Sequence, residues 1–123
     1  MKEPTRITTL TSLVPYVRDR VIRILAAMEA QGFDPKQFET LRTKERQQFL
    51  FSIGRTRQKN RRPVTYIDGI TRTSMHQRGK ACDIISKSRW WDWPAFYKAL
   101  KREAKKEDMH TLNFEQNHIE WRG

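Results

Sequence analysis

The sequence has little cysteine, no long apolar run and few acidic residues. Its one cysteine, Cys82, cannot form an internal disulfide, so folding needs no oxidising compartment. The apolar run from Ile24 to Met28 is far shorter than the ~18 residues of a membrane span, and no signal-peptide pattern opens the chain. We therefore expect a protein without a transmembrane segment or signal peptide, made and folded in the cytoplasm.

Basic residues outnumber acidic residues by 25 to 14, which gives a formal net charge of +11. This charge predicts attraction to polyanions such as nucleic acid, anionic lipid head groups or an acidic cell envelope, and its sign does not choose among them. The basic stretch over residues 55–62 keeps open the interpretation of a nucleic-acid-binding module, which would bind DNA or RNA in a salt-sensitive way. No RNA-binding aromatic motif or helix-turn-helix pattern accompanies that stretch.

The length of 123 residues suits one domain over residues 1–123. Apolar residues at helical spacing from Val17 to Met28 predict an amphipathic helix, with Pro15 in its first turn and Gly32 at its end. Further expected elements are a turn at 34–35, a strand over 38–42, a helix from Thr43 to Gly54, a strand over 64–66, a turn at 68–69, a strand over 80–86, a helix from Pro94 and a last strand through 118–121. Helices and strands mix without βαβ alternation. We therefore predict an α+β fold with a small antiparallel sheet flanked by helices.

Two histidines and one aspartate are candidate ligands of a catalytic metal ion. His76 and Asp83 stand seven positions apart, and His118 lies near the end of the sequence. Two imidazoles and one carboxylate give Zn²⁺ three protein ligands and leave the fourth position open for water. A strand that starts near residue 80 after a bend at Gly79 would carry Asp83 towards His76, and a second strand would bring His118 across. We expect this zinc site to lie on the sheet.

Such a site also needs a carboxylate that takes a proton from water and gives one to the leaving amine. Glu115, three residues before His118, is the first candidate. Glu120, two residues after His118, would share its side of an ideal strand, so geometry alone does not exclude it. Two other residues are expected to play no part in metal binding. His110 is expected to be a surface residue or a core residue with its hydrogen bonds satisfied, and Cys82 a small core residue on the opposite face from Asp83.

A cluster of three tryptophans, at positions 90, 91 and 93, has two interpretations. The rings could stack on the sugars of a glycan, or they could pack around the start of the following helix, which is the more common role of such a cluster.

These residues resemble the zinc D-alanyl-D-alanine carboxypeptidases and L-alanyl-D-glutamate endopeptidases, grouped with lysostaphin and Sonic hedgehog. The family's motif Ser-x-His-x-x-Gly-x-Ala-x-Asp stands without a gap at residues 74–83, and its second motif, an acidic residue three before the last His with a following Glu-Trp, at residues 115–121. Residues 39–47 resemble the family's Arg-Thr-x-x-x-Gln segment, and residues 52–56 the Gly-Arg-Thr of short endolysins. The chain departs from the family at Thr40-Leu41, where Gly-Tyr is common, and over residues 105–113, where members often carry a Gly- and Trp-rich stretch.

The resemblance implies roles for six residues. His76, Asp83 and His118 would bind zinc, and Glu115 would be the general base and acid. Arg42 would polarise the scissile carbonyl and stabilise its oxyanion, and Ser74 would line the substrate site. The expected activity is hydrolysis of the L-alanyl-D-glutamate bond of the peptidoglycan stem peptide. A D-alanyl-D-alanine carboxypeptidase on the same site is the alternative, and an inactive zinc-bearing binding domain is a third hypothesis, against which the presence of Glu115 speaks.

The resemblance to short members further indicates a phage or prophage endolysin. We expect a monomer made in the host cytoplasm that reaches the cell wall after release by a holin and has no specific nucleic-acid partner. The positive charge would draw the enzyme to anionic envelope polymers over a Debye length of ~8 to 10 Å.

Overall fold

The structure is a computed structural model, and it describes residues 2–123. The elements in chain order are η1 (Leu10–Ser12), α1 (Pro15–Ala30), β1 (Pro35–Glu39), α2 (Lys44–Ser52), β2 (Ala81–Ser86), α3 (Pro94–Lys106), β3 (His110–Leu112) and β4 (Glu115–Glu120). The strands form one sheet in the order β1-β2-β4-β3, and all neighbouring strands are antiparallel. This architecture confirms the predicted α+β class and antiparallel sheet.

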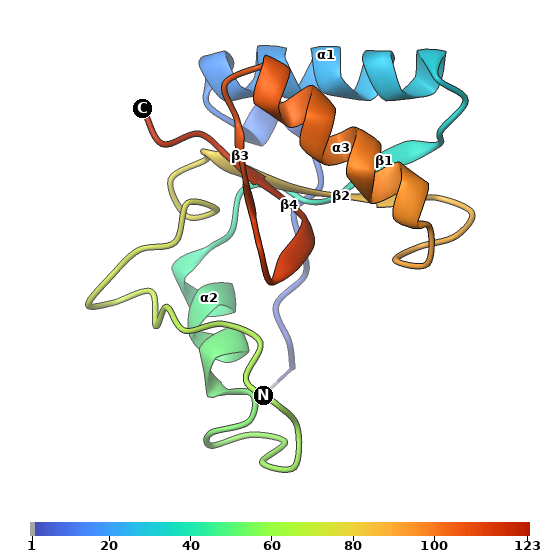
Figure 1. The fold of residues 1–123 in the computed structure, drawn as a ribbon. Coiled ribbons are helices and arrows are strands. Elements are labelled where there is room, and N and C mark those ends of the chain that lie inside the picture. Colours follow the sequence, from blue (N-terminus) through green and yellow to red (C-terminus); the bar gives the residue numbers. More distant parts are fainter. Residues whose placement is uncertain (1) are drawn as a thin grey trace.

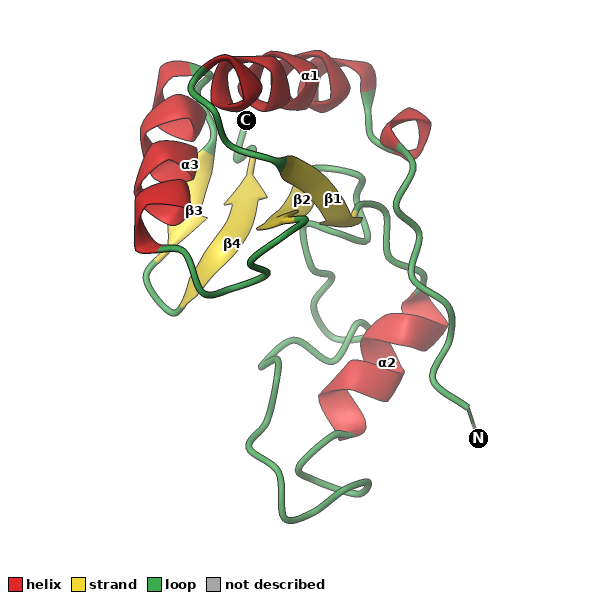
Figure 2. Cartoon of the chain, turned by 90° about the vertical axis from the view of Figure 1, so that its right-hand side faces the viewer, coloured by secondary structure: helices red, strands yellow, loops and turns green. Residues whose placement is uncertain are grey.

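The helices lie on opposite sides of the sheet. Helices α1 and α3 cover one face, and α2 lies beyond the other face together with the long loop that follows it (Figures 1 and 2). The apolar core fills the layer between the sheet and the α1/α3 pair, and fully buried members are Val17, Val21, Ile24, Ile84, Phe96, Leu100 and Ile119. Burial of each such side chain contributes about 1.5–3 kcal/mol, so this layer supports the sheet from behind and leaves its other face for the site.

Strand β2 is buried along its whole length and divides its side chains between the two faces. Cys82 belongs to the apolar core and is 0% exposed, which confirms its prediction as a core residue. Successive side chains of a strand point to opposite faces, so Asp83 points away from that core. Asp83 is paired with His118 of β4, and the pleat therefore places these two side chains next to each other on the site face.

Strand β1 begins and ends three residues earlier than the predicted strand over 38–42, which was wrong in its bounds. Pro35 starts the strand because β1 is an edge strand, where a missing N–H costs no ladder bond. Gln37 pairs with Ile84 and Glu39 pairs with Asp83, so Phe38 is an extra, bulged residue. Bulges of this kind re-aim side chains beside functional sites, and this one sets Glu39 in line with Asp83.

The predicted helices are confirmed. Pro15 opens α1 and Pro94 opens α3, as expected of a residue whose missing N–H would have no partner in a first helical turn. The Thr43 hydroxyl accepts the N–H of Arg46 at 3.2 Å and so caps α2. Gly54 follows α2 with a φ of 81°, a conformation that glycine adopts without strain.

Two details of the sheet were not predicted correctly. Residues 64–66 form no strand; they belong to the loop after α2, where the Gln47 amide donates to the Ile67 carbonyl at 2.7 Å. The alternation of apolar and polar residues predicted a strand here, but a strand also needs a neighbouring strand for its backbone hydrogen bonds. Residues 64–66 pair with no other strand of the described chain. Strand β3 was not predicted, because its three residues are too few to show a pattern. Within residues 2–123, no helix has the length and apolarity to cross a membrane.

Candidate metal centre

The three predicted metal ligands meet on the site face of the sheet. One potential ligand atom from each of His76, Asp83 and His118 lies within 4.8 Å of the others, and all three residues are buried. Asp83 Oδ1 is 3.1 Å from His76 Nε2 and 3.1 Å from His118 Nδ1. His76 reaches this point from a turn that closes at Gly79, whose φ is 69°.

The outer nitrogens of both imidazoles are held by acceptors. His76 Nδ1 is 2.8 Å from the Thr40 carbonyl, which can only accept, so this nitrogen carries a proton. His118 Nε2 donates in the same way to Glu120 Oε1 at 2.8 Å. The inner nitrogens, Nε2 of His76 and Nδ1 of His118, then face the Asp83 carboxylate with lone pairs. Because two lone pairs and a carboxylate repel one another, a metal cation or additional protons must lie between them. The donor set and the contacts behind it therefore fit a zinc ion.

The buried charged groups of the site shift one another's pKa values. Burial raises the pKa of Asp83, but the positive charge of His76 and the hydrogen bonds of both histidines outweigh burial and hold the pKa well below its usual range. Burial lowers the pKa of His118, but its hydrogen bonds to Asp83 and Glu120 outweigh this and raise the pKa to about 9.

The two candidate carboxylates have different positions. Glu115 Oε2 is 3.9 Å from His118 Nδ1, on the inner side of the ring, and its side chain is 35% exposed. Burial and the negative charge of Asp83 raise the pKa of Glu115, and nearby positive charges only partly offset this. Glu120 lies on the outer side of the same ring, where it also accepts from Arg122 Nε at 2.9 Å. The hydrogen bond to His118 dominates in lowering the pKa of Glu120 to about 2.

Arg42 approaches the site from the segment between β1 and α2. Its Nη2 is 3.9 Å from Asp83 Oδ2, and its side chain is largely buried. Glu39 accepts from Nε and Nη2 of Arg42, and Gln47 accepts from Nη1 at 2.9 Å. The guanidinium is therefore fixed in place by neighbours on both sides.

Ser74 begins the turn that carries His76. Its hydroxyl accepts the N–H of Gln77 at 3.2 Å, and its own N–H donates to the Gln77 side chain at 2.8 Å. Ser74 is 6% exposed. These contacts stabilise the turn and leave the residue at the wall of the cleft.

A cleft of about 850 Å³ opens over the site. Its lining includes all six residues that the sequence singled out: Arg42, Ser74, His76, Asp83, Glu115 and His118. The exposed rings of Tyr66 and Phe114 also line it. The volume lies in the range typical of ligand-binding sites.

The N-terminal segment forms part of the wall. The Ile7 carbonyl accepts both the N–H and the hydroxyl of Thr40, at 2.8 and 3.0 Å. Arg46 donates to the Glu3 carboxylate and to the Pro4 carbonyl, each at 2.9 Å. Because the Thr40 carbonyl accepts from His76, this segment supports a metal-ligand candidate through one intermediate residue.

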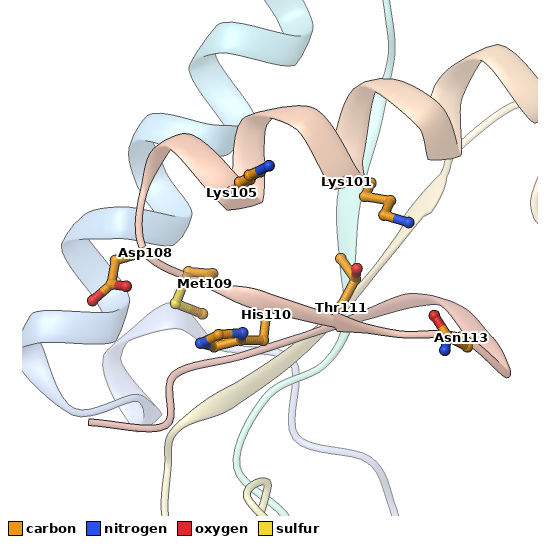
Figure 3. Close-up of a pocket in the computed structure, with 7 residues that line it drawn as sticks. All are labelled: Lys101, Lys105, Asp108, Met109, His110, Thr111 and Asn113. Carbon is orange, nitrogen blue, oxygen red and sulfur yellow. The ribbon is translucent and has the colours of Figure 1, made fainter.

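His110 lies elsewhere. A second depression, of about 370 Å³, lies between α3 and β3, where His110 is exposed near Lys101 and Lys105 (Figure 3). None of the six predicted site residues lines it. Of the two placements expected for His110, the structure shows the surface one.

Sequence reasoning missed the residues behind the site. Thr40 and Glu39 were taken only as part of a strand-to-helix segment, and no partner was expected for either. Glu120 was considered as a base, whereas the structure places it behind His118. The one available signal was the close spacing of Glu39, Arg42 and Arg46, which places opposite charges three and seven residues apart.

Similar folds occur among solved peptidase structures. The LdcB LD-carboxypeptidase matches with a TM-score of 0.68 at 20% identity, over 90% of this chain and 59% of that one. A zinc-bound variant of the VanY D,D-pentapeptidase from the VanB-type resistance cassette matches with a TM-score of 0.70 at 18% identity, over 90% and 73%. The L-Ala D-Glu endopeptidase ChiX of Serratia marcescens matches with a TM-score of 0.55 at 20% identity, over 97% and 91%.

These likenesses show the fold, and this chain spans about three fifths of the length of LdcB. No curated protein sequence matches the chain. The fold is thus shared with peptidases, and the His-Asp-His donor set is one that could hold a metal ion. The family model described as VanY, D-alanyl-D-alanine carboxypeptidase, matches residues 11–123, so the chain belongs to this family of peptidoglycan-acting zinc peptidases. The family resemblance drawn from the sequence motifs is thereby confirmed.

Proposed function

We propose that this chain is a zinc-dependent peptidoglycan peptidase that hydrolyses the L-alanyl-D-glutamate bond of the stem peptide. One observation carries the proposal. His76, Asp83 and His118 converge in one cleft, and their ligand atoms lie close enough together to bind a single cation. These three residues would hold Zn²⁺. When bound, zinc supplies Lewis acidity and lowers the pKa of a bound water towards ~7.

Glu115 is the proposed proton carrier. Its carboxylate lies beside the inner face of His118 and reaches the cleft, whereas Glu120 is occupied by His118 and Arg122. A raised pKa suits a group that must accept a proton from the attacking water and return it to the leaving amine near neutral pH. Such transfer typically contributes 10²–10⁴-fold to the rate.

Arg42 and Ser74 are the proposed substrate contacts. A guanidinium fixed by Glu39 and Gln47 can donate to the oxyanion that develops on the scissile carbonyl without first having to reorient. Ser74 lines the cleft two residues before His76, at the start of the same turn, where its hydroxyl would contact the peptide.

A D-alanyl-D-alanine carboxypeptidase is the second candidate, and the description of the matching family favours it. Both reactions would use the same site. Purified enzyme with measured zinc content should be incubated with purified muropeptides and the products weighed by mass spectrometry. Cleavage between L-alanine and D-glutamate supports the proposal, and release of a single terminal D-alanine supports the carboxypeptidase instead. No hydrolysis with zinc bound would contradict both.

The biological setting is part of the proposal. We infer that residues 1–123 act as one monomeric endolysin domain, which a holin releases from the host cytoplasm and the net charge of +11 draws to the envelope. Expression in a host bacterium tests this setting: cells should lyse when a holin is co-expressed and stay intact without it.

A further inference from the structure

Two exposed tryptophans and the half-buried Phe38, whose ring lies 3.7 Å from the Arg6 guanidinium, form an aromatic group at the edge of the sheet. We call Phe38, Trp90 and Trp91 the aromatic platform. The Phe38 ring lies 5.3 Å from Trp91 and 6.5 Å from Trp90, and the two tryptophan rings lie 5.5 Å apart, tilted by 34°. Trp90 is 47% exposed and Trp91 is 44% exposed. Large apolar groups left open together usually mark a binding surface.

The platform is held rigidly by its backbone. Trp90 has a φ of 54°, which is a strained conformation for a residue with a large side chain. Its N–H donates to the Ser86 carbonyl at 3.0 Å, and its carbonyl accepts from the Tyr97 hydroxyl. Asp34 in turn accepts from the Ser86 hydroxyl at 2.6 Å and from the Ser88 N–H at 2.9 Å. The turn is fixed on several sides while the ring that it carries stays in solvent.

Core packing does not explain the platform. The neighbouring Trp93 does have a core role, because its ring contacts Phe33 and Phe96 at 5.0 and 6.0 Å. Trp90 and Trp91 instead contact each other, Phe38 and the ammonium of Lys36, which lies 5.0 Å from the Trp90 ring. The two interpretations of the tryptophan cluster thus apply to different members of it.

The platform continues into the catalytic cleft. Phe38 and Trp91 both line the cleft, and Trp90 extends the surface beyond it. Phe38 directly precedes Glu39, which pairs with Asp83. The Trp91 carbonyl accepts from the Gln116 side chain at 3.0 Å, and Gln116 directly follows Glu115. A ligand on the platform therefore lies next to the residues that would act on the peptide.

We propose that the aromatic platform binds a pyranose ring of the peptidoglycan glycan strand. This inference rests on the proposed function and deepens it. A pyranose ring has an apolar C–H face that fits the exposed part of a tryptophan ring, with the Phe38 ring standing nearly perpendicular beside it, at 78° to Trp90 and 87° to Trp91. The hydroxyl and amide groups at the rim of the sugar suit polar neighbours such as Lys36, Ser88 and Gln116. A rigid ring pays little conformational entropy on binding to a rigid platform.

The position of the platform also distinguishes the two candidate bonds. The L-alanyl-D-glutamate bond is one residue from the muramic acid, roughly 3.5 Å of extended chain, whereas the D-alanyl-D-alanine bond is four residues away, roughly 14 Å. A sugar-binding surface in the same cleft as the triad would favour the bond next to the sugar. Binding of the adjacent sugar would explain the exposed tryptophans in an endopeptidase, but not in a carboxypeptidase that acts at the far end of the stem peptide.

Two substrates test the inference: a disaccharide-peptide, and the same peptide freed of sugar by an amidase. We expect the wild-type kcat/KM to be at least about tenfold higher for the disaccharide-peptide, as one ring contact of this kind implies. Trp90→Ala should lower this ratio towards one, and Trp90→Tyr, which keeps a ring, should restore most of it. Tyr16→Ala is the matched control, because Tyr16 is an exposed ring that stacks on Trp121 and does not line the cleft. A wild-type ratio near one, or equal ratios in all variants, would overturn the inference.

A binding measurement separates this inference from the proposed function. Peptide-free glycan strands should quench the tryptophan fluorescence of the wild type and, to a much smaller extent, that of Trp90→Ala. If no peptide is cleaved but this difference is seen, the hydrolysis proposal fails and the glycan site stands. If peptides are cleaved but glycan binds both proteins equally or binds neither, the glycan site fails and the hydrolysis proposal stands.

Discussion

Glu39 accepts two hydrogen bonds from the guanidinium of Arg42, at 2.8 Å to Nη2 and 3.2 Å to Nε. The same carboxylate accepts from Arg46 Nε, and Glu39 is only 2% exposed. Burial raises the pKa of Glu39, but the hydrogen bonds from both arginines outweigh burial and lower it. One buried anion thus orients the cation that faces the cleft.

Replacement of this anion should affect both stability and activity. Glu39→Gln leaves two largely buried guanidinium groups without their carboxylate, so we expect a loss of about 3 kcal/mol in the free energy of unfolding, measured by urea denaturation. We also expect slower lysis of purified cell walls at unchanged zinc content, because Arg42 loses its fixed orientation. Glu107→Gln removes a more exposed ion pair with Arg23 and should cost no more than about 0.5 kcal/mol. Equal losses in the free energy of unfolding would show that the buried ion pairs of Glu39 stabilise the fold no more than the more exposed ion pair of Glu107.

Zinc should stabilise the fold. A ligand that binds only the folded state at 1,000 times its Kd adds about 4 kcal/mol, so a chelator should lower the melting temperature and added zinc should restore it. Asp83→Asn removes the charge at the centre of the candidate site and should abolish this response. His110→Ala, which changes a histidine outside the cleft, should keep it. A chelator-insensitive melting temperature in the wild type would refute zinc binding by the triad.

Replacement of Glu115 should lower the catalytic rate, whereas replacement of Glu120 should weaken zinc binding. Glu115→Gln should keep zinc and lower kcat by about 10²–10⁴-fold, because it removes the proton carrier. Glu120→Gln weakens the contact that orients His118 and should weaken zinc binding by about 10–100-fold, with activity recovered at high zinc. Zinc titration and cell-wall turbidity assays on both variants measure these effects. The opposite pattern would exchange the two roles.

Acid should weaken the turn that holds the aromatic platform. The hydrogen bond from Ser86 dominates in lowering the pKa of Asp34 below its ordinary value of 3.8. A carboxyl group whose folded pKa is lowered contributes stability above its unfolded pKa, and this contribution disappears as the pH falls through the folded pKa. Asp34→Asn should therefore lower the melting temperature at pH 7, and its difference from the wild type should shrink below pH 3.8. A difference that does not change with pH would rule out the charge of Asp34 as its source.

The convergence of His76, Asp83 and His118 on one face of the sheet could be predicted from the sequence because it depends on local rules. Strand alternation places Cys82 in the core and Asp83 on the opposite face, and antiparallel pairing brings His118 beside Asp83. The register of β1 could not be predicted in the same way. The bulge at Phe38 changes which residues pair, and it depends on contacts with β2 and with the N-terminal segment that no local pattern reveals.

The contacts behind the site were hidden for a related reason. Thr40 receives its partners Ile7 and His76 from residues 33 and 36 positions away, and Glu120 is revealed as a partner of His118 only once the ring orientation is known. Spacing along the sequence identifies which groups share a strand face. It does not say which nitrogen of an imidazole points inward.

The hydrogen bonds that Thr40 donates to Ile7 and that His76 donates to Thr40 have a practical consequence for anyone who handles this protein. Affinity tags and fusion partners are best attached after Gly123, because deletion or displacement of residues 2–8 would remove the partner of Thr40 and so disturb the orientation of the His76 ring. A truncated protein that fails to bind zinc would then report a misplaced ring and not the wrong ligand.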